Sequence, residues 1–554
     1  MTSFASSHVA EHDAIIVGSG VNSLACGAFL ARAGWRVAVL ERESELGGAV
    51  RTAELTEPGF HHDVFSAWHP LWVGGPAHAE LGDALAERGL EYLNTVHPTG
   101  TLFPDGESAF LTAGTDGNAA ELDRNAPGDG DAWRETIAAV AAQAELVFGV
   151  LGTELWSRAG LNLGVKAYRR LGRRGLAEFG GELVQTSRDW LTTTFRSERA
   201  HGLLAPWVLH TGLGPDAAAS GFMTRVIAFA IEAGGMPIPR GGGARLVDAL
   251  VRLIEDHGGT CRTGQDVERI VVSGGRATGV RLTDGEVLDA GRAVVCNVTP
   301  TQLYGRLLEP GDVPAEVGEA GKRFRFGRSE MQIHFALSEP PRWDGDDRLG
   351  RTAIVHLTPG LDGVSRAVNE AERGLLPAEA TVVVGQPLTI DDTRAPAGKG
   401  LLWIQLQELP WHVRGDAAGE LDTGGGTWTE SLRERYADRI QARLAQHIPN
   451  LESSILKRVA LSPADLQAAN INLQQGDPYS GSLALDQNFL WRPFARQPGH
   501  STSIDGLFQI GASTWPGPGL GAGSGTLVAK ELLQPPVAER IAGRVTSFLR
   551  PRQA

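Results

Sequence analysis

The sequence predicts an α/β fold, α+β overall, in which one domain with a parallel sheet is assembled from separated segments and a mixed α/β domain is inserted between them. Two observations predict this arrangement. Residues 13–41 have the pattern of a strand, a glycine turn, a helix and a second strand. Residues 507–533 have a similar pattern, with a short strand, a glycine-rich loop and the start of a helix.

The N-terminal unit has the features of a dinucleotide-binding site. An apolar strand is followed by the turn Gly18-Ser-Gly20, and the second strand ends at Glu41. The two glycines allow the backbone to approach a pyrophosphate, the helix N-terminus supplies N–H groups, and the carboxylate accepts hydrogen bonds from ribose hydroxyls. Ser23 takes the place of the third glycine of this fingerprint, where a small side chain still allows close packing. We therefore predict dinucleotide binding.

The rest of the chain has a mixed pattern of helices and short strands. The elements expected there are a helix over 133–151, an amphipathic helix after 239–243, strands over 267–272, 277–282 and 293–296, a strand over 331–337 and a helix over 429–446. The predicted nucleotide domain comprises residues 1–75, 236–300 and 497–554, and the predicted substrate-binding domain comprises residues 76–235 and 301–496.

The composition argues against several classes of protein. A formal net charge of −14 argues against a nucleic-acid partner, which needs clustered positive charge. The three cysteines form no C-x-x-C pair, so we expect no zinc or other metal site and no disulfide framework, which fits a cytoplasmic protein. Residues 1–12 lack the pattern of a secretory signal, and no stretch approaches the run of about 18 apolar residues that predicts a membrane span. Only five of the 51 Lys and Arg residues are lysine, a bias typical of a GC-rich bacterial gene.

Several glycine-rich stretches together point to a known family. They are Gly18-x-Gly20, Gly47-Gly48-Ala-Val-Arg51-Thr52, Pro239-x-Gly-Gly242 and the loop from Gly511 to Gly525 that contains Pro516-Gly517-Pro-Gly519-x-Gly521-Ala522. This combination resembles the phytoene-dehydrogenase-related flavoproteins, a group that includes carotenoid desaturases, the flavin type of carotenoid ketolase and further oxidoreductases.

The resemblance implies a glutathione-reductase-type FAD-binding Rossmann domain joined to a substrate domain, as in amine oxidases. The FAD-binding residues that it and the fingerprint imply are Gly18, Gly20, Ser23, Glu41, Arg42, Gly48, Arg51, Val267, Gly511, Gly521 and Ala522. In this arrangement the helix that starts near Ala522 directs N–H groups at the flavin edge where negative charge accumulates on reduction. A nicotinamide site is not expected, because the run Gly241–Gly243 is not paired with a strand that ends in a ribose-binding acid. Electrons would then leave the flavin for oxygen, a quinone or another acceptor.

Two residues are catalytic candidates beside the flavin. His69 ends a segment rich in histidine, residues 59–69, which follows the first βαβ unit, where related enzymes bring the chain across the flavin. The competing interpretation is a strand with packed or solvated histidines. Trp515 lies in the last loop, where the family often has His-Pro-Gly-Gly-Gly, and the competing interpretation is an indole that fills the core. His334 is more readily interpreted as a core histidine than as a cavity residue.

A basic segment, residues 156–179, stands out in this acidic chain. Its Arg and Lys residues alternate with leucines, a pattern that fits contact with anionic lipid while a lipophilic substrate enters. A solvated helix face or a subunit contact would give the same pattern.

The resulting hypothesis is an FAD-dependent enzyme that dehydrogenates, or otherwise oxidises, a hydrophobic small molecule of the isoprenoid or polyene type by hydride transfer to the flavin. Three alternatives stay open at this point. They are an amine oxidase, a redox-neutral isomerase that uses reduced flavin, and an escort protein of the same fold that binds lipidated partners without FAD. Retention of Gly18, Gly20 and Glu41 argues against the escort protein.

Overall fold

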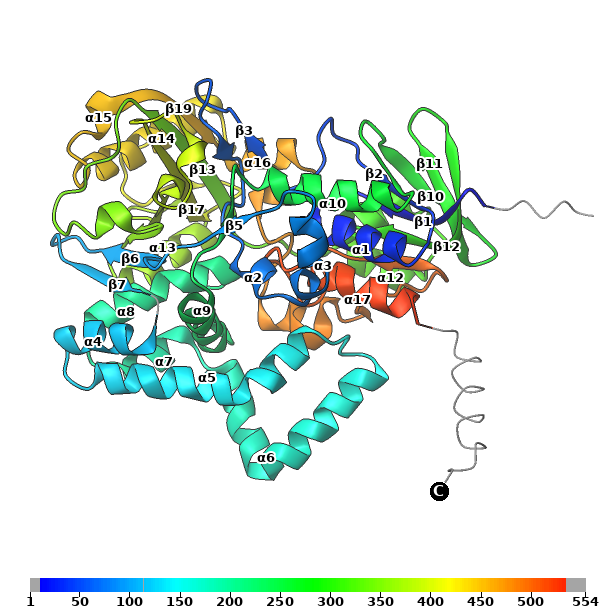
Figure 1. Ribbon diagram of the computed structural model, residues 1–554, viewed down its shortest axis with the longest axis horizontal. Helices are drawn as coiled ribbons and strands as arrows, with labels where there is room; N and C mark the ends of the chain where they lie inside the picture. Colours follow the sequence, from blue (N-terminus) through cyan, green and yellow to red (C-terminus); the bar gives the residue numbers. More distant parts are fainter. Residues whose placement is uncertain (1–9, 113, 535–554) are drawn as a thin grey trace, which may run out of the picture.

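The computed structural model describes residues 10–112 and 114–534, and two seven-stranded sheets organise this part of the chain (Figure 1). The first sheet has the order β10-β11-β12-β1-β2-β9, with β22 beside β12. Its strands are β1 His12–Val17, β2 Val37–Leu40, β9 Thr260–Arg262, β10 Val267–Ser273, β11 Arg276–Leu282, β12 Val287–Cys296 and β22 Leu507–Gln509. β1 pairs in parallel with β2 and β12, and β22 pairs in parallel with β12.

Both faces of the first sheet are buried, as expected for parallel strands between two layers. In β1, Ala14 and Ile16 pack on one side with helices α1, α3, α10 and α17, whereas Ile15 and Val17 pack on the other side with the meander strands and α12. These helices are α1 Val21–Arg32, α3 Pro76–Ala86, α10 Ala244–Asp256, α12 Ala315–Lys322 and α17 Gly523–Leu532. All strands of this sheet fall within the three segments that we assign to the nucleotide domain.

The second sheet has the order β19-β13-β17-β16-β14-β6-β7. Its strands are β6 Thr99–Leu102, β7 Ser108–Leu111, β13 Ser329–Leu337, β14 Ile354–Leu357, β16 Val382–Gly385, β17 Gly400–Leu409 and β19 Ile455–Leu461. Alternate residues of β13 and β17, such as Ile333 and Ile404, pack in a core with α14 (Glu430–Ala445), which therefore covers the outer face. The residues between them face the opposite side of the sheet.

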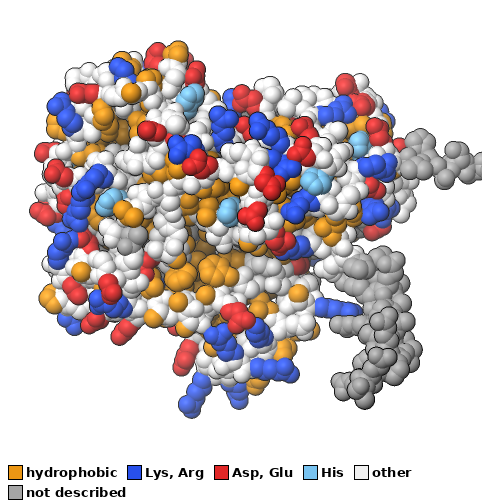
Figure 2. Space-filling view, viewed as in Figure 1, with side chains coloured by type: hydrophobic (Ala, Val, Ile, Leu, Met, Phe, Trp, Pro, Cys, Tyr) orange, Lys and Arg blue, Asp and Glu red, His pale blue; other side chains and the backbone are white. Residues whose placement is uncertain are grey.

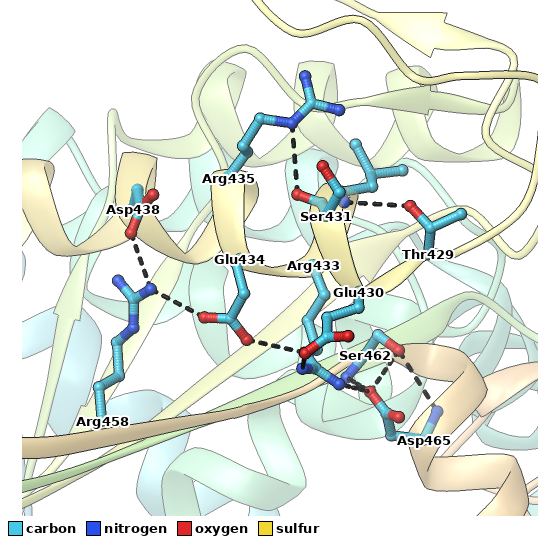
Figure 3. Close-up of polar contacts among 11 residues, drawn as sticks. Thr429, Glu430, Ser431, Arg433, Glu434, Arg435, Asp438, Arg458, Ser462 and Asp465 are labelled. Atoms are coloured by element: carbon cyan, nitrogen blue, oxygen red, sulfur yellow. Dashed lines mark hydrogen bonds and ion pairs between the residues drawn. The ribbon is translucent and has the colours of Figure 1, made fainter.

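A polar network fixes α14 against β19 and the short helix α16 (Pro463–Ala469), as Figure 3 shows. Arg433 contacts Asp465 at 3.2 Å and Glu434 at 2.9 Å, and Arg458 contacts Glu434 at 3.0 Å. Asp465 also completes a capping box with Ser462 at the start of α16. This network lies on the outer face of the second sheet and connects α14 to the edge strand β19 and to α16.

Residues 115–234 are mainly helical, and two of their helices form a hairpin whose bent second helix projects from the body (Figure 1). The hairpin comprises α5 (Asp129–Leu151) and α6 (Arg158–Val184), and Gly172, with a φ of 66°, interrupts α6. Within α6 only Ala167 is buried. No described helix is long and apolar enough to span a bilayer.

The other elements are short or lie between these units. The helices are α2 Pro70–Val73, α4 Thr115–Asn125, α7 Ser187–Thr194, α8 Glu198–Leu204, α9 Ser220–Gly234, α11 Pro300–Gln302, α13 Leu361–Glu372 and α15 Leu451–Ser454. The paired short strands are β3 Thr52–Ala53 with β4 His62–Asp63, β5 Tyr92–Leu93 with β8 Ile238–Pro239, β15 Leu375–Leu376 with β18 Gly415–Asp416, and β20 Pro493–Phe494 with β21 Gln497–Pro498.

The structure confirms the predicted mixed α/β fold and the types of the predicted elements, with different ends for some of them. β12 begins at Val287 instead of 293, because its first half pairs with β11 and its second half joins the parallel sheet. α17 begins at Gly523, within a stretch whose glycines obscure the helical pattern. Residues 1–9 and 535–554 of the assigned nucleotide domain lie outside the described residues.

Candidate functional site

A cavity of about 420 Å³ is lined by residues of both sheets, and it extends from the β1–α1 turn to the inner face of the second sheet. At one end it is bordered by the turn 17–22, by Glu41 and by residues 265–267. At the other end it is bordered by α9, by β13 and by β17. Residues 512 and 518–520 of the last loop also line it. The first glycine turn and the last glycine loop therefore border the same cavity.

Glu41 is held rigidly at the nucleotide end, one residue after β2. Its Oε2 accepts hydrogen bonds from the N–H of Ser19 at 2.9 Å and from Ser19 Oγ at 2.7 Å, and its Oε1 accepts one from the N–H of Glu43 at 3.0 Å. The side chain is 7% exposed. β1 and β2 are parallel, so their carboxyl ends meet at one edge of the sheet, which is where this fold type binds nucleotides.

Positive φ angles and close contacts favour glycine at the positions beside Glu41. Gly18 has a φ of +86°, and a Cβ on Gly20 would lie 2.9 Å from Asn297 Nδ2. Gly48 has a φ of +61°, and its Cβ would lie 3.2 Å from the Cα of Gly20. Helix α1 starts after Gly20 without a side-chain cap. The first N–H groups of α1 are therefore available to an anion, as a dinucleotide pyrophosphate requires.

Asn297 links the N-terminal turn to the last loop. It follows β12, and its Nδ2 donates a 2.9 Å hydrogen bond to Ser23 Oγ. A Cβ on Gly511 would lie 2.1 Å from Asn297 Oδ1, so only glycine fits there without a shift. Ser23 is thus more than a small replacement for glycine, because its hydroxyl fixes the amide that separates the two glycine segments.

Helix α17 starts beside helix α1. Ala522, with a φ of 52°, is the N-cap residue of α17 and makes no side-chain cap. The N–H of Gly525 and Ser524 Oγ each donate a 3.2 Å hydrogen bond to Asn22 Oδ1. This geometry brings the N-terminal ends of both helices to the same region, and it fits a cofactor that carries negative charge there.

The residues predicted to bind FAD fall into two sets in the structure. Those that line the cavity are Gly18, Gly20, Glu41, Arg42, Gly48, Arg51 and Val267. Those that do not line it are Ser23, Gly511, Gly521 and Ala522. Arg42 pairs with Glu43 at 3.2 Å and Arg51 pairs with Glu45 at 2.6 Å, and all four side chains keep more than a third of their surface exposed.

The inner part of the cavity is walled by tryptophan and aliphatic side chains. The apolar residues that line it are Phe65, Trp68, Trp207, Ile227, Ile231, Met236, Ile354 and Trp403. The rings of Trp68 and Trp403 meet edge to face with centroids 5.2 Å apart. Gly385 makes room for this pair, because a Cβ there would lie 2.2 Å from Cη2 of Trp68.

Glu330 and His210 line this inner part, and both are neutral at pH 7. Burial raises the pKa of Glu330 to about 8, although Gln405 and Gln332 donate hydrogen bonds to its carboxyl group. Burial lowers the pKa of His210 to about 4, and its Nε2 lies 3.2 Å from Nε2 of His356. Because both histidines are buried, one ring donates to the other as a neutral pair.

His69 and Trp515 do not line the cavity. His69 is fully buried, its Nδ1 lies 2.9 Å from the hydroxyl of Tyr92, and burial lowers its pKa to about 4. Trp515 is 2% exposed and its Nε1 donates to the carbonyl of Val150 at 3.2 Å. Both side chains are buried, as the packing interpretation expects, and their catalytic roles stay predictions. His334 is also fully buried, with its ring centroid 5.1 Å from that of His62.

The polar residues of the inner wall are not among those predicted from the sequence. Glu330 belongs to β13, and Gln405 and Gln407 belong to β17. The sequence pattern could have predicted residues that face a cavity from β13, because polar residues alternate with Met331 and Ile333 at the period of a strand. Two polar rows on adjacent strands of a buried sheet indicate a lined cavity more strongly than an isolated histidine does.

Comparison with known proteins agrees with this geometry. Residues 24–513 match the model of the family described as flavin containing amine oxidoreductase. The chain is 24% identical over 545 residues to a limonene dehydrogenase subunit of Castellaniella defragrans, with 95% of each chain covered. It is 27% identical to the zeta-carotene-forming phytoene desaturase of Myxococcus xanthus, over 91% of this chain and 90% of that one.

A solved structure shows the same fold. The cyclohexylamine oxidase of Brevibacterium oxydans matches with a TM-score of 0.54 and 17% identity, over 94% of this chain and all of the other. The glycine turns, the fixed carboxylate and the two helix N-termini fit FAD, which is the cofactor. The resemblance to FAD oxidoreductases related to phytoene dehydrogenase is confirmed. The protein is an FAD-dependent oxidoreductase, and the chain belongs to the flavin-containing amine oxidoreductase family.

Proposed function

We propose that the protein dehydrogenates, or otherwise oxidises, a hydrophobic substrate of the isoprenoid type. The observation that carries this proposal is the inner cavity, where three tryptophans and several aliphatic side chains form the wall. The charged groups that line the cavity, such as Glu41 and Arg51, gather at the nucleotide end, whereas Glu330 and His210 are neutral. Two relatives, a limonene dehydrogenase subunit and a phytoene desaturase, carry names that support the same substrate class.

Each part of the chain has a role in this reaction. Bound FAD supplies a two-electron oxidant. Trp68 and Trp403 shape the inner wall, and the apolar surroundings exclude water from the reacting carbon atoms. No described lysine lines the cavity, and the titratable side chains of its inner part are neutral, so positioning by apolar contacts contributes more than acid–base catalysis by this wall.

Anaerobic titration of the FAD-loaded protein tests the proposal. Monoterpenes, longer polyenes and primary amines are each added, and loss of the visible absorption of oxidised flavin is followed. We expect isoprenoids to reduce the flavin and amines not to reduce it. Reduction by amines alone would support an amine oxidase instead. A shifted double bond in the recovered isoprenoid, formed only after prior reduction of the flavin, would support an isomerase.

We also propose that the α5–α6 hairpin rests on an anionic lipid surface from which such a substrate enters. Trp156, Leu161 and Tyr168 are 62%, 70% and 53% exposed, and Leu161, Val165 and Tyr168 recur at helical spacing. Arg169, Arg173 and Arg174 are exposed and make no ion pair with a described residue. Figure 2 shows Lys and Arg side chains at the projecting end of this hairpin. Exposed aromatic and aliphatic groups beside unpaired arginines match an anionic bilayer.

Helix α9 connects this hairpin to the cavity. Phe222 and Phe229 of α9 contact Phe179 of α6 and Phe148 of α5, with ring centroids 6.2 and 6.5 Å apart. Ile227 and Ile231, on a different face of α9, line the cavity. Hydrophobic side chains gather in the middle of the face shown in Figure 2. A lipophilic molecule that leaves a bilayer at the hairpin would therefore reach the cavity along an apolar helix.

A further inference from the structure

A row of polar side chains crosses the otherwise apolar inner wall of the cavity. Glu330 of β13 and Gln405 and Gln407 of β17 line the cavity from adjacent antiparallel strands. Glu330 and Gln407 are almost entirely buried, with exposed fractions of 3% and 4%, and Gln405 is partly buried. The pairing register of β13 and β17 shifts between Ser329 and Met331, so Glu330 sits at an irregularity of the kind that redirects side chains beside active sites.

The hydrogen bonds within this row leave defined groups free. Gln405 Nε2 donates to Glu330 Oε2 at 2.7 Å, and Gln332 Nε2 donates to Oε1. The hydroxyl of Tyr479 donates to the carbonyl of Leu209 at 2.8 Å, so it must accept from Gln407 Nε2, which lies 2.6 Å away. Gln407 Oε1 is then left as an acceptor, and it has no partner among the described residues.

The same wall holds unpaired donors. The indole N–H groups of Trp68, Trp207 and Trp403 are buried and have no acceptor among the described residues. Glu330 has no cationic partner among the described residues, and burial, together with the nearby Asp477, raises its pKa so that it keeps its proton at neutral pH. A ligand without polar atoms would leave all these groups unsatisfied, which is unfavourable in a buried site. An oxygen atom on the ligand would accept a hydrogen bond from the protonated carboxyl group of Glu330, and a hydroxyl would also donate to Gln407.

We propose that the row of Glu330, Gln405 and Gln407 binds the oxygen atom of an oxygenated hydrophobic substrate, an alcohol or carbonyl compound on an otherwise hydrocarbon skeleton. This inference rests on the proposed function and narrows its substrate class. The row acts by recognition, because a protonated carboxyl group and amides bind and orient the oxygen without taking part in bond breaking.

Matched ligands of one skeleton test the inference. Limonene lacks oxygen, whereas carveol and carvone carry a hydroxyl or a carbonyl group on the same ten-carbon skeleton. Dissociation constants are measured on the FAD-loaded protein from the perturbation of the flavin spectrum, with thermal shift as a second readout. We expect carveol and carvone to bind at least about tenfold more tightly than limonene, the equivalent of about 1.4 kcal/mol. Equal affinities for the three ligands would overturn the inference.

Variants of the row then test which residues cause the preference for oxygenated ligands. Gln407→Leu and Glu330→Leu are expected to reduce it to about threefold or less while limonene binding is kept or improved. Glu330→Gln should retain it, because an amide also donates a hydrogen bond. Gln446→Leu, at the exposed end of α14, is the matched control. If the preference for oxygenated ligands survives both leucine variants, the row does not bind the ligand oxygen. A shifted spectrum of the ligand-free flavin in those variants would then show that the row contacts the flavin instead.

These measurements separate the two proposals. The binding constants do not depend on turnover, so a preference for oxygenated ligands can be present even if no isoprenoid reduces the flavin. Conversely, reduction of the flavin by limonene without any preference would support the proposed function and refute the role of the polar row.

Discussion

The side-chain oxygen of Asn22, in the first turn of α1, accepts a 3.2 Å hydrogen bond from the backbone N–H of Gly525, in the first turn of α17. The two residues are 503 positions apart in the sequence. This bond fixes the N-termini of the two helices that border the cofactor cradle. The contact is so close that a Cβ on Gly525 would lie 2.0 Å from the carbonyl oxygen of Asn22.

The first prediction is that Gly525→Ala separates these helices and lowers FAD retention. A contact of 2.0 Å with backbone cannot be relieved by a side-chain rotation, so one helix must move. We expect a lower melting temperature and substantially less flavin per protein after gel filtration. Gly164→Ala is the matched control, because a methyl group on this exposed helical glycine would have no described atom within 4 Å. Full flavin content in Gly525→Ala would contradict the prediction.

The second prediction concerns Glu41. Its two oxygens accept three hydrogen bonds from Ser19 and Glu43, and Glu41→Gln replaces one acceptor by an NH₂ group that faces donors. Hydrogen bonds to charged groups contribute about 1.5–3 kcal/mol, so we expect FAD affinity to fall by roughly ten- to a hundredfold. Flavin fluorescence during reconstitution of the apoprotein measures this. Glu87→Gln, at a residue whose side chain is 77% exposed, should leave affinity unchanged.

The sequence predicts the cofactor end of the site better than the substrate end, for a physical reason. Gly18, Gly20 and Glu41 act through local backbone geometry within one βαβ unit, so their spacing carries the information. Glu330 and Trp68 come to line the same cavity only because the second sheet packs against segments that are distant in the sequence. His69 lies between two residues that line the cavity but contacts Tyr92 and does not line the cavity itself, so its catalytic role stays a prediction.

The third prediction concerns the tryptophan pair. A methyl group on Gly385 would lie 2.2 Å from Trp68 and 3.0 Å from Trp403, so Gly385→Ala should displace the Trp68 indole. We expect KM for the reducing substrate to rise several-fold while flavin content stays normal. The double variant Gly385→Ala/Trp68→Phe removes the clash, and its effect should be smaller than the sum of the two single effects. If the effects of the two single variants on KM simply add in the double variant, the clash between residue 385 and Trp68 does not determine substrate binding.

The fourth prediction is a loss of stability in acid. Burial lowers the pKa of His69, His210 and His334 to about 4, below the value of about 6.5 in the unfolded chain. The unfolded state therefore binds protons first, and the stabilisation is complete above pH 6.5 and falls as the pH drops towards 4, by up to about 1.4 kcal/mol per unit for each residue. The melting temperature should decrease from pH 7 to pH 5. His334→Phe should make this decrease smaller. If the melting temperature of the variant depends on pH as strongly as that of the native protein, the lowered pKa of His334 is contradicted.

The fifth prediction tests the hairpin on membranes. Each basic residue near an anionic surface contributes about 1 kcal/mol of binding, so the triple variant Arg169→Gln/Arg173→Gln/Arg174→Gln should bind vesicles of phosphatidylcholine and phosphatidylserine at least tenfold more weakly than the native protein. Sedimentation with vesicles measures the bound fraction. Added salt should weaken native binding, because a surface charge is screened over about 10 Å at 0.1 M salt.

Matched variants separate the hairpin from net charge in this prediction. Arg323→Gln/Arg342→Gln/Arg245→Gln removes the same charge from side chains that are 80%, 70% and 57% exposed on other elements, and it should keep native binding. Leu161→Asp removes apolar contact at a residue that is 70% exposed, so it should weaken binding without unfolding the protein. If all three variants bind like the native chain, or if the native chain ignores anionic vesicles, the projecting hairpin serves a contact other than lipid.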